Sequence, residues 1–169
     1  MPTSSPSIQI CQRFNEIRWH DAELRSFLVN YSPPESGCET AYEITLTVDL
    51  STFQVAPRRE VFTPIELKFI HPRYFRSDVD LLGMSYCVGD IAYAECSGQS
   101  DFKRQVLQTK IVHSDTPEYE KYWNDLSHFH IYLCDPSGEI NVIAEDFEIR
   151  NLPANITNDG RTITTLRAD

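Results

Sequence analysis

The strict alternation of apolar and polar residues in "AYEITLTVDL", residues 41–50, is the feature that most constrains the fold. Its apolar side chains occupy every second position: Tyr42, Ile44, Leu46, Val48 and Leu50. The positions between them, from Glu43 to Asp49, are polar. Successive side chains of a strand point to opposite faces, so the pattern predicts a strand with one face in a core and one in water.

Other segments repeat this pattern. "PIELKFI" (64–70) and the stretch around Phe27, Val29 and Tyr31 predict strands, and "DVDLL" (78–82) and "DIAYAECS" (90–97) predict shorter ones. Residues 128–149 predict a hairpin turning at "DPSG". Its inward set is expected to be Phe129, Ile131, Leu133, Ile140 and Val142, later shifting from Ala144 to Phe147 and Ile149. That shift predicts a bulge near Glu145–Asp146.

Helical signals are fewer. "SIQICQRFNEIR" (7–18) has apolar residues at intervals of three from Ile8 to Ile17, which fits an amphipathic helix or an irregular lead-in. "FKRQVLQTKIV" (102–112) fits either a strand or a helix. "TPEYEKYWNDL" (116–126) predicts a short helix capped by Thr116, with Pro117 at its first position. The expected fold is therefore β-rich α+β, either a mostly antiparallel curved sheet or a small sandwich, with one or two short helices.

The chain length of 169 residues predicts a single domain, 1–169, that can bury a core without disulfides or metals. We expect residues 1–7 to be a loose N-terminal arm and residues 153–169 a polar, mobile tail. The start of the chain does not resemble a signal peptide, and no apolar run has the length of a membrane span. Five scattered cysteines without a C-x-x-C motif fit a reducing, cytoplasmic compartment, with most thiols acting as small buried apolar groups.

The net charge of −10 is unevenly distributed. Residues 111–150 contain nine acidic and two basic residues. Such a field repels a phosphate backbone, so we expect no nucleic-acid partner, and it attracts a basic protein. The helix at 116–126 provides the candidate partner-binding residues Glu118, Glu120, Tyr122 and Asp125. An alternative is that the acidic residues only keep the protein soluble.

The stretch "WHDAEL" contains a candidate motif, Trp19, His20 and Asp21. A carboxylate bonded to His20 would raise its pKa, as a general base requires, but neighbouring residues contact each other only in a turn. If such a turn forms, the Asp21 carboxylate is expected to bond nearby backbone groups, and Trp19 to cover the core edge. The structural role is favoured over a catalytic one, because no partner for a third catalytic role follows from the sequence.

A second candidate site is the row His128, His130 and Cys134 on one strand face. Imidazoles and thiolates bind zinc or copper, yet His130 and Cys134 are on the order of 13 Å apart along an extended strand. We therefore expect no metal and no cofactor. The alternative, a His128–His130 metal site completed by distant ligands, remains open.

"WHDAEL" leading into a strand resembles the "HD-[AS]-x-[LI]" motif of the immunity protein 50 family of small bacterial immunity-type domains. "ITLTVDL", "PIELKFIHPRYFRSDVDLLG" and "HIYLCDPSGEINVIAEDFEI" resemble the strands that follow in that family, over roughly residues 19–149. Residues 32–40 and 101–127 depart from the shorter family pattern. The resemblance implies a non-enzymatic protein that neutralises a toxin domain by stoichiometric binding, and it brings no catalytic residues.

The leading expectation is therefore a cytoplasmic, non-enzymatic protein that binds a protein partner, such as a basic toxin domain. The alternative is a small enzyme, or a ligand- or metal-binding domain, that uses His20 with Asp21 or His128 with His130. This alternative predicts a concave pocket lined by those residues. The sequence does not fix the oligomeric state.

Overall fold

The computed structural model describes residues 6–32, 41–55, 58–79, 89–111, 116–135 and 137–153. The fold is α+β and rich in strand, as the alternating segments predict. Its elements, in chain order, are α1 (Pro6–Asn15), β1 (Ala22–Ser32), β2 (Ala41–Val55), β3 (Arg58–Ile70), β4 (Tyr74–Ser77), β5 (Gly89–Ser97), α2 (Asp101–Ile111), α3 (Pro117–Asp125), β6 (Ser127–Asp135), β7 (Ser137–Ala144) and β8 (Asp146–Asn151).

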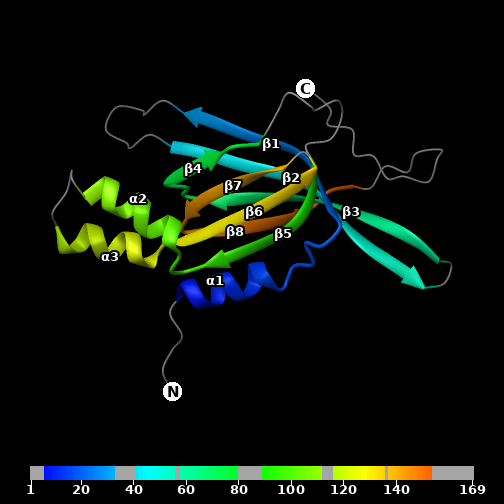
Figure 1. Ribbon diagram of the computed structural model, residues 1–169, viewed down its shortest axis with the longest axis horizontal. Coiled ribbons are helices and arrows are strands. Elements are labelled where there is room, and N and C mark those ends of the chain that lie inside the picture. The colour runs from blue at the N-terminus through cyan, green and yellow to red at the C-terminus, as the bar shows by residue number, and fades with distance from the viewer. Residues whose placement is uncertain are drawn as a thin grey trace, which may run out of the picture.

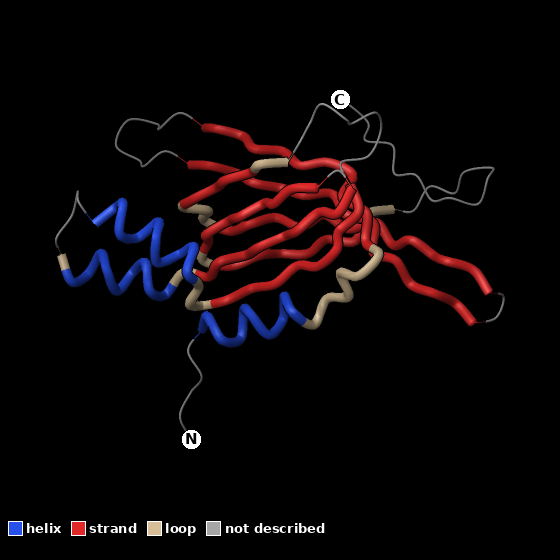
Figure 2. Tube along the Cα trace, in the orientation of Figure 1, coloured by secondary structure: helices blue, strands red, loops and turns tan. Residues whose placement is uncertain are grey.

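All strands belong to one antiparallel sheet with the order β4-β7-β6-β5-β1-β2-β3-β8. The β2–β3 hairpin extends well beyond its neighbours, and α2 and α3 lie side by side at the opposite end (Figure 1). Figure 2 shows α1 running along the rim of the sheet, where it packs chiefly on β5. Among the described helices, none is long and apolar enough to span a membrane.

Two chain segments cross the same corner of the sheet. The β3–β8 ladder ends with Ile70 opposite Asp146, and the β4–β7 ladder begins with Tyr74 opposite Ile143. The β3–β4 segment therefore pairs with the β7–β8 segment on both sides of the corner, and the register of the pairing changes by one residue between the two ladders. Glu145 lies between β7 and β8, and its amide donates to the Ile70 carbonyl at 3.1 Å. Between the pairs Ile70–Asp146 and Tyr74–Ile143 lie three residues on the β3–β4 side, 71–73, and two on the β7–β8 side, 144 and 145. The irregularity therefore falls at the predicted corner, but its extra residue is on the opposite segment from the one predicted, and it lets the sheet curl around its inner face.

The inner face holds the main core. Alternating residues of β2, β3, β6 and β7 are almost completely buried, as predicted: Ile44, Leu46, Val48, Ile65, Leu67, Phe69, Phe129, Ile131, Leu133, Ile140 and Val142. Phe14 of α1 is fully buried among them, with ring centroids 4.8 to 5.3 Å from those of Trp19, Phe129 and Phe147. The amphipathic face of α1 therefore closes the open side of the curled sheet.

A smaller core lies on the outer face of β7. Val106 of α2, Trp123 of α3 and Leu126 cover the buried side chain of Ile143. Thr116 caps α3 by accepting a hydrogen bond from the Tyr119 amide, and Pro117 follows it, as the sequence predicts. The ambiguous segment 102–112 is a helix over its described part, because its apolar residues pack between α3 and the sheet.

A bulge in β1 explains a change in the parity of its inward residues. Ala22 and Leu24 are fully buried, but the next core contact is made by Phe27, at an odd position. The β1–β2 register shifts between Leu24 and Ser26, so Arg25 is the extra residue. The shift returns the apolar side chains to the core and leaves Arg25 on the outer face.

Several burial expectations are wrong. Ile8 and Ile149 were expected inside but are about half exposed, at 50% and 44%. Ser7 takes the place of Ile8 against the sheet, because the helix begins at Pro6, within the expected loose arm. Asp49, expected on a wet face, is 1% exposed. "DVDLL" does not begin a strand, since β4 ends at Ser77, and residues 80–82 lie outside the described part.

Candidate functional site

The WHD stretch forms a tight turn before β1. The Ala22 amide donates to the Trp19 carbonyl at 3.0 Å, and Asp21 takes a left-handed backbone conformation with φ of 64°. Within this turn, His20 Nδ1 and Asp21 Oδ2 lie 2.7 Å apart. The turn is the one that the favoured structural role requires, but the Asp21 carboxylate contacts the neighbouring imidazole, where bonds to nearby backbone groups were expected. Trp19 is buried beside Phe14, and its indole N–H donates to the Phe14 carbonyl at 3.0 Å.

An open cleft of about 650 Å³ lies beside this turn. It forms where β1 and β5 pair over only three residue pairs, Ala22 to Leu24 with Ile91 to Gly89, before they diverge. The described residues that line it are His20, Asp21, Glu23, Phe62, Asp90, Ile91, Ala92 and Cys134. Three carboxylates, one imidazole and one thiol therefore face a common space.

Some polar groups of the cleft already have partners in the protein. Glu23 pairs with Arg25 at 2.8 Å, and the Cys134 thiol donates to the Asp90 carbonyl at 3.5 Å. The side chains of His20 and Asp21 are 79% and 63% exposed. The carboxylates can attract a cationic group, and the His20–Asp21 pair is open to water.

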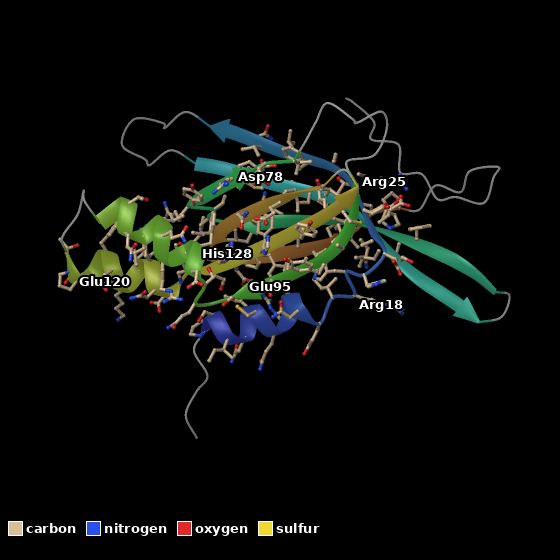
Figure 3. The ribbon with its side chains drawn as sticks, viewed as in Figure 1. Arg18, Arg25, Asp78, Glu95, Glu120 and His128 are labelled. Carbon is tan, nitrogen blue, oxygen red and sulfur yellow. The ribbon has the colours of Figure 1, made fainter. Side chains whose placement is uncertain are left out.

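The second candidate is the histidine row of β6, of which Figure 3 labels His128. His128 is 5% exposed, stacks on Phe102 of α2 at 4.8 Å, and its Nε2 lies 3.0 Å from Asn141 Oδ1. Burial lowers the pKa of His128, and the hydrogen bond with Asn141 opposes that effect. The two rings of His128 and His130 are stacked with centroids 6.0 Å apart.

His130 lies between two carboxylates from neighbouring strands. Its Nδ1 is 3.7 Å from Glu95 Oε1, and its Nε2 is 3.4 Å from Glu139 Oε2. The Tyr93 ring contacts it edge-on and stacks on Tyr132. Among the described residues, no group of three or more His, Cys, Asp or Glu side chains has a geometry that could hold a metal ion. Cys134 opens into the cleft instead, away from this row.

The third candidate, helix α3, presents only part of its expected surface. Glu118, Glu120 and Asp125 are exposed. Tyr122 is half-buried and donates to Glu145 Oε1 at 3.0 Å, so it ties α3 to the corner between β7 and β8. Burial, followed by this hydrogen bond, raises the pKa of Tyr122.

A polar network that the sequence did not suggest surrounds Glu145 at that corner. His71, which has a left-handed φ of 46°, places Nδ1 2.8 Å from Glu145 Oε2. Arg73 donates to the Tyr122 hydroxyl and stacks over its ring at 5.3 Å. Burial raises the pKa of Glu145, but the contacts with His71, Tyr122 and Arg73 outweigh it, so the pKa is lowered.

The acidic run 111–150 therefore does not form one patch. Glu145 and Asp146 are paired with His71 and Arg13, and Glu139 faces His130. Within the described part of the run, the exposed carboxylates of α3 form a separate group. The cleft carboxylates, Asp21, Glu23 and Asp90, lie outside this run in the sequence. They come together because β1 pairs with β5, and no local sequence pattern predicts that pairing.

Comparison with known proteins gave no match to a protein family, to a curated protein or to a solved structure. The resemblance to immunity-type domains therefore stays a prediction.

Proposed function

We propose that the protein is a stoichiometric binding protein that accepts a basic segment of a protein partner in the His20–Asp21 cleft. The observation that carries the proposal is the convergence of the Asp21, Glu23 and Asp90 carboxylates on one open space of about 650 Å³. Charge of one sign in a concave surface concentrates the field and attracts the opposite charge.

The chemistry of the cleft favours a protein partner over a small molecule. Small-molecule sites usually enclose their ligand and are lined mainly by apolar and aromatic side chains. Here the apolar groups are Phe62, Ile91 and Ala92, and the His20–Asp21 pair is largely exposed. A partner's lysine or arginine side chain can enter while its backbone remains outside.

The resemblance of "WHDAEL" to immunity-type domains suggests the class of partner: a toxin domain with a basic catalytic surface. Blocking such a surface requires complementary charge and a stable complex, and no turnover. In the motif itself, the buried Ala22 and Leu24 anchor β1, while His20 and Asp21 face the cleft.

The test is calorimetric titration of the protein with a toxin-like protein encoded by a neighbouring gene. We expect one-to-one binding that weakens at least about tenfold in Asp21→Asn/Asp90→Asn, a loss of about 1.4 kcal/mol. The matched control is Glu118→Gln/Glu120→Gln, which removes the same charge from α3. Binding that survives the cleft substitutions unchanged would contradict the proposed surface.

A second candidate function, a small enzyme, is favoured by one observation. His20 and Asp21 are 2.7 Å apart in a cleft that also contains Cys134, and an imidazole oriented by a carboxylate is a general-base arrangement. Turnover on a hydrolase substrate panel that disappears in His20→Ala, with an unchanged melting temperature, would favour this candidate over the binding protein.

A further inference from the structure

Two cysteines that are far apart in sequence meet in the fold. Cys11 on α1 and Cys96 on β5 are separated by 85 residues, yet their Sγ atoms lie 2.9 Å apart. Both are free thiols; Cys96 is buried, and Cys11 is half-buried at the helix surface. From the sequence, most of the five thiols are expected to act as small buried apolar groups.

The backbone around the pair is held in place. Asn15, one turn after Cys11, donates from Nδ2 to the Cys96 carbonyl at 3.1 Å and accepts from the Cys96 amide at 2.6 Å. This two-point contact fixes α1 against β5 where the sulfur atoms face each other. The packing of α1 on β5 therefore fixes the position of the two cysteines relative to each other.

The surroundings stabilise negative charge on Cys11. The hydrogen bond from Cys96 is the main cause that lowers the pKa of Cys11 to about 7; burial opposes it, while Ser127, Lys103 and the Gly98 backbone support it. The same hydrogen bond, followed by burial, raises the pKa of Cys96. Cys11 is therefore the more acidic thiol of the pair, and Cys96 the one that keeps its proton.

Lys103 lies near the pair, and its positive charge helps to lower the pKa of Cys11, although burial lowers the pKa of Lys103 itself. Its side chain is buried, and Nζ donates to the carbonyls of Gly98 at 2.8 Å, Asn124 at 3.0 Å and Leu126. Carbonyl groups orient the ammonium without neutralising it. The fully buried Ser127 hydroxyl also faces the pair, and it has no hydrogen-bond partner of ordinary geometry among the described residues.

We propose that Cys11 and Cys96 form a redox-active dithiol that reacts with small-molecule disulfides, with Cys11 as the attacking and Cys96 as the resolving cysteine. The thiolate is the reactive form of a cysteine, and partial exposure with a nearby cation distinguishes reactive thiols from inert ones. A neighbouring thiol within reach is what converts a mixed disulfide into an internal one.

The reaction is balanced by glutathione disulfide as the oxidant. The Cys11 thiolate attacks one sulfur atom of glutathione disulfide, which breaks its S–S bond and releases one glutathione thiolate. Cys96 then loses its proton to solvent and attacks the Cys11 sulfur, which releases the second glutathione. The two protein thiols are oxidised, and the disulfide is reduced to two glutathione molecules. Loss of the Cys11 thiolate in the first step removes the main cause of the raised Cys96 pKa.

The product would attach α1 covalently to β5. The sulfur atoms must approach from 2.9 Å to about 2.0 Å, a movement that side-chain rotation can supply. Because the bond closes a loop of about 85 residues, oxidation is expected to raise the melting temperature by about 5–10 °C.

Mass mapping of the full chain after equilibration with glutathione disulfide tests the proposal. Cleavage before aspartate residues places the five cysteines in five different fragments, with Cys11 in 1–20 and Cys96 in 90–100. We expect these two fragments to be cross-linked in the wild type and in Cys134→Ser, and the cross-link to be absent in Cys11→Ser. A wild-type protein that shows no such cross-link in an oxidising glutathione buffer overturns the proposal.

The rate of Cys11 alkylation by iodoacetamide gives a second readout that does not require oxidation. In the wild type its pH midpoint is expected near 7, and in Cys96→Ala it is expected to move towards the ordinary thiol value of about 8.5. Alkylation of the exposed Cys134 in the same samples is the internal control. A Cys11 midpoint that is the same with and without Cys96 contradicts the roles assigned to the two thiols.

Discussion

Arg25 reaches across from β1 to β2 and donates from Nε to Oδ2 of Asp49 at 2.7 Å. The carboxylate is 1% exposed, and the guanidinium, which also pairs with Glu23, is 30% exposed. Oδ1 of Asp49 has no hydrogen-bond partner of ordinary geometry among the described residues. The bulge at Arg25 therefore places the cation next to a charge that the sheet has buried.

Arg25→Ala is expected to destabilise the fold by about 2–3 kcal/mol, because removing one partner leaves an uncompensated buried charge. The value lies below that for fully buried pairs, since water can enter the space left by the half-exposed guanidinium. Urea unfolding measures the loss. The double variant Arg25→Ala/Asp49→Asn should recover part of it, and a double variant less stable than Arg25→Ala would show that the charge is not the cause.

A series at Asp21 separates backbone conformation from side-chain function. With φ of 64°, an alanine at this position is strained by about 1 kcal/mol, whereas glycine adopts the conformation freely. We expect Asp21→Ala to lower stability by about that amount and Asp21→Gly to change it by less than about 0.5 kcal/mol. Thermal unfolding distinguishes the two variants. Equal losses would mean that the carboxylate, and not the backbone, stabilises the turn, and unchanged stability with lost partner binding would assign the pair to function.

His128 should make stability depend on pH. Burial beneath Phe102 is the main cause that lowers its pKa in the folded state. Of the neighbouring groups, Asn141 and Glu95 raise this pKa, and His130 and Lys103 lower it. Between the ordinary value of about 6.5 and the lower folded value, the unfolded chain binds more protons, so stability falls as pH falls. Unfolding titrations at pH 7.5 and 5.5 should therefore show a larger loss in the wild type than in His128→Gln. Equal losses in both proteins would remove His128 as a cause.

The sequence predicted those elements whose pattern is local. The alternation in 41–50 and 64–70 identified the apolar inward residues of β2 and β3. It did not indicate that Thr47 and Asp49, on the opposite face of β2, are buried as well. The shift from Ala144 to Phe147 indicated an irregularity at the corner, but not that its extra residue lies in segment 71–73. A similar change of parity between Leu24 and Phe27 in the sequence matches the bulge at Arg25.

The candidate site depended on pairings that no local pattern contains. Asp90 and Cys134 join His20 only because β5 lies between β1 and β6 in the sheet. Cys11 meets Cys96 because α1 packs on β5. The acidic run 111–150 predicted a single charged surface, but its members separate onto α3, the outer face of β7 and the corner. A count of charges along the chain does not predict the charge of a surface, because successive residues of a strand point to opposite faces of the sheet.

The proposed cleft and the acidic surface of α3 can be distinguished by the rate of association. Arg25, beside the cleft, and Glu120 on α3 lie far apart, on opposite sides of the main body of the sheet, as Figure 3 shows. Surface charges act over roughly 8 Å at physiological ionic strength, so each group attracts a partner only to its own side. Two triple variants that change the net charge equally are therefore a matched pair: Asp21→Asn/Glu23→Gln/Asp90→Asn in the cleft, and Glu118→Gln/Glu120→Gln/Asp125→Asn on α3.

Stopped-flow measurements across a salt series give the decisive comparison. We expect the on-rate of the wild type to fall with added salt, because screening removes the attraction that raises the encounter rate. The cleft variant should associate several-fold more slowly at low salt and lose most of the salt dependence, while the α3 variant should remain close to the wild type. The reverse result would place the partner on α3, the surface suggested by the sequence. An on-rate that does not respond to salt in any of the three proteins would rule out an electrostatic interface on either side.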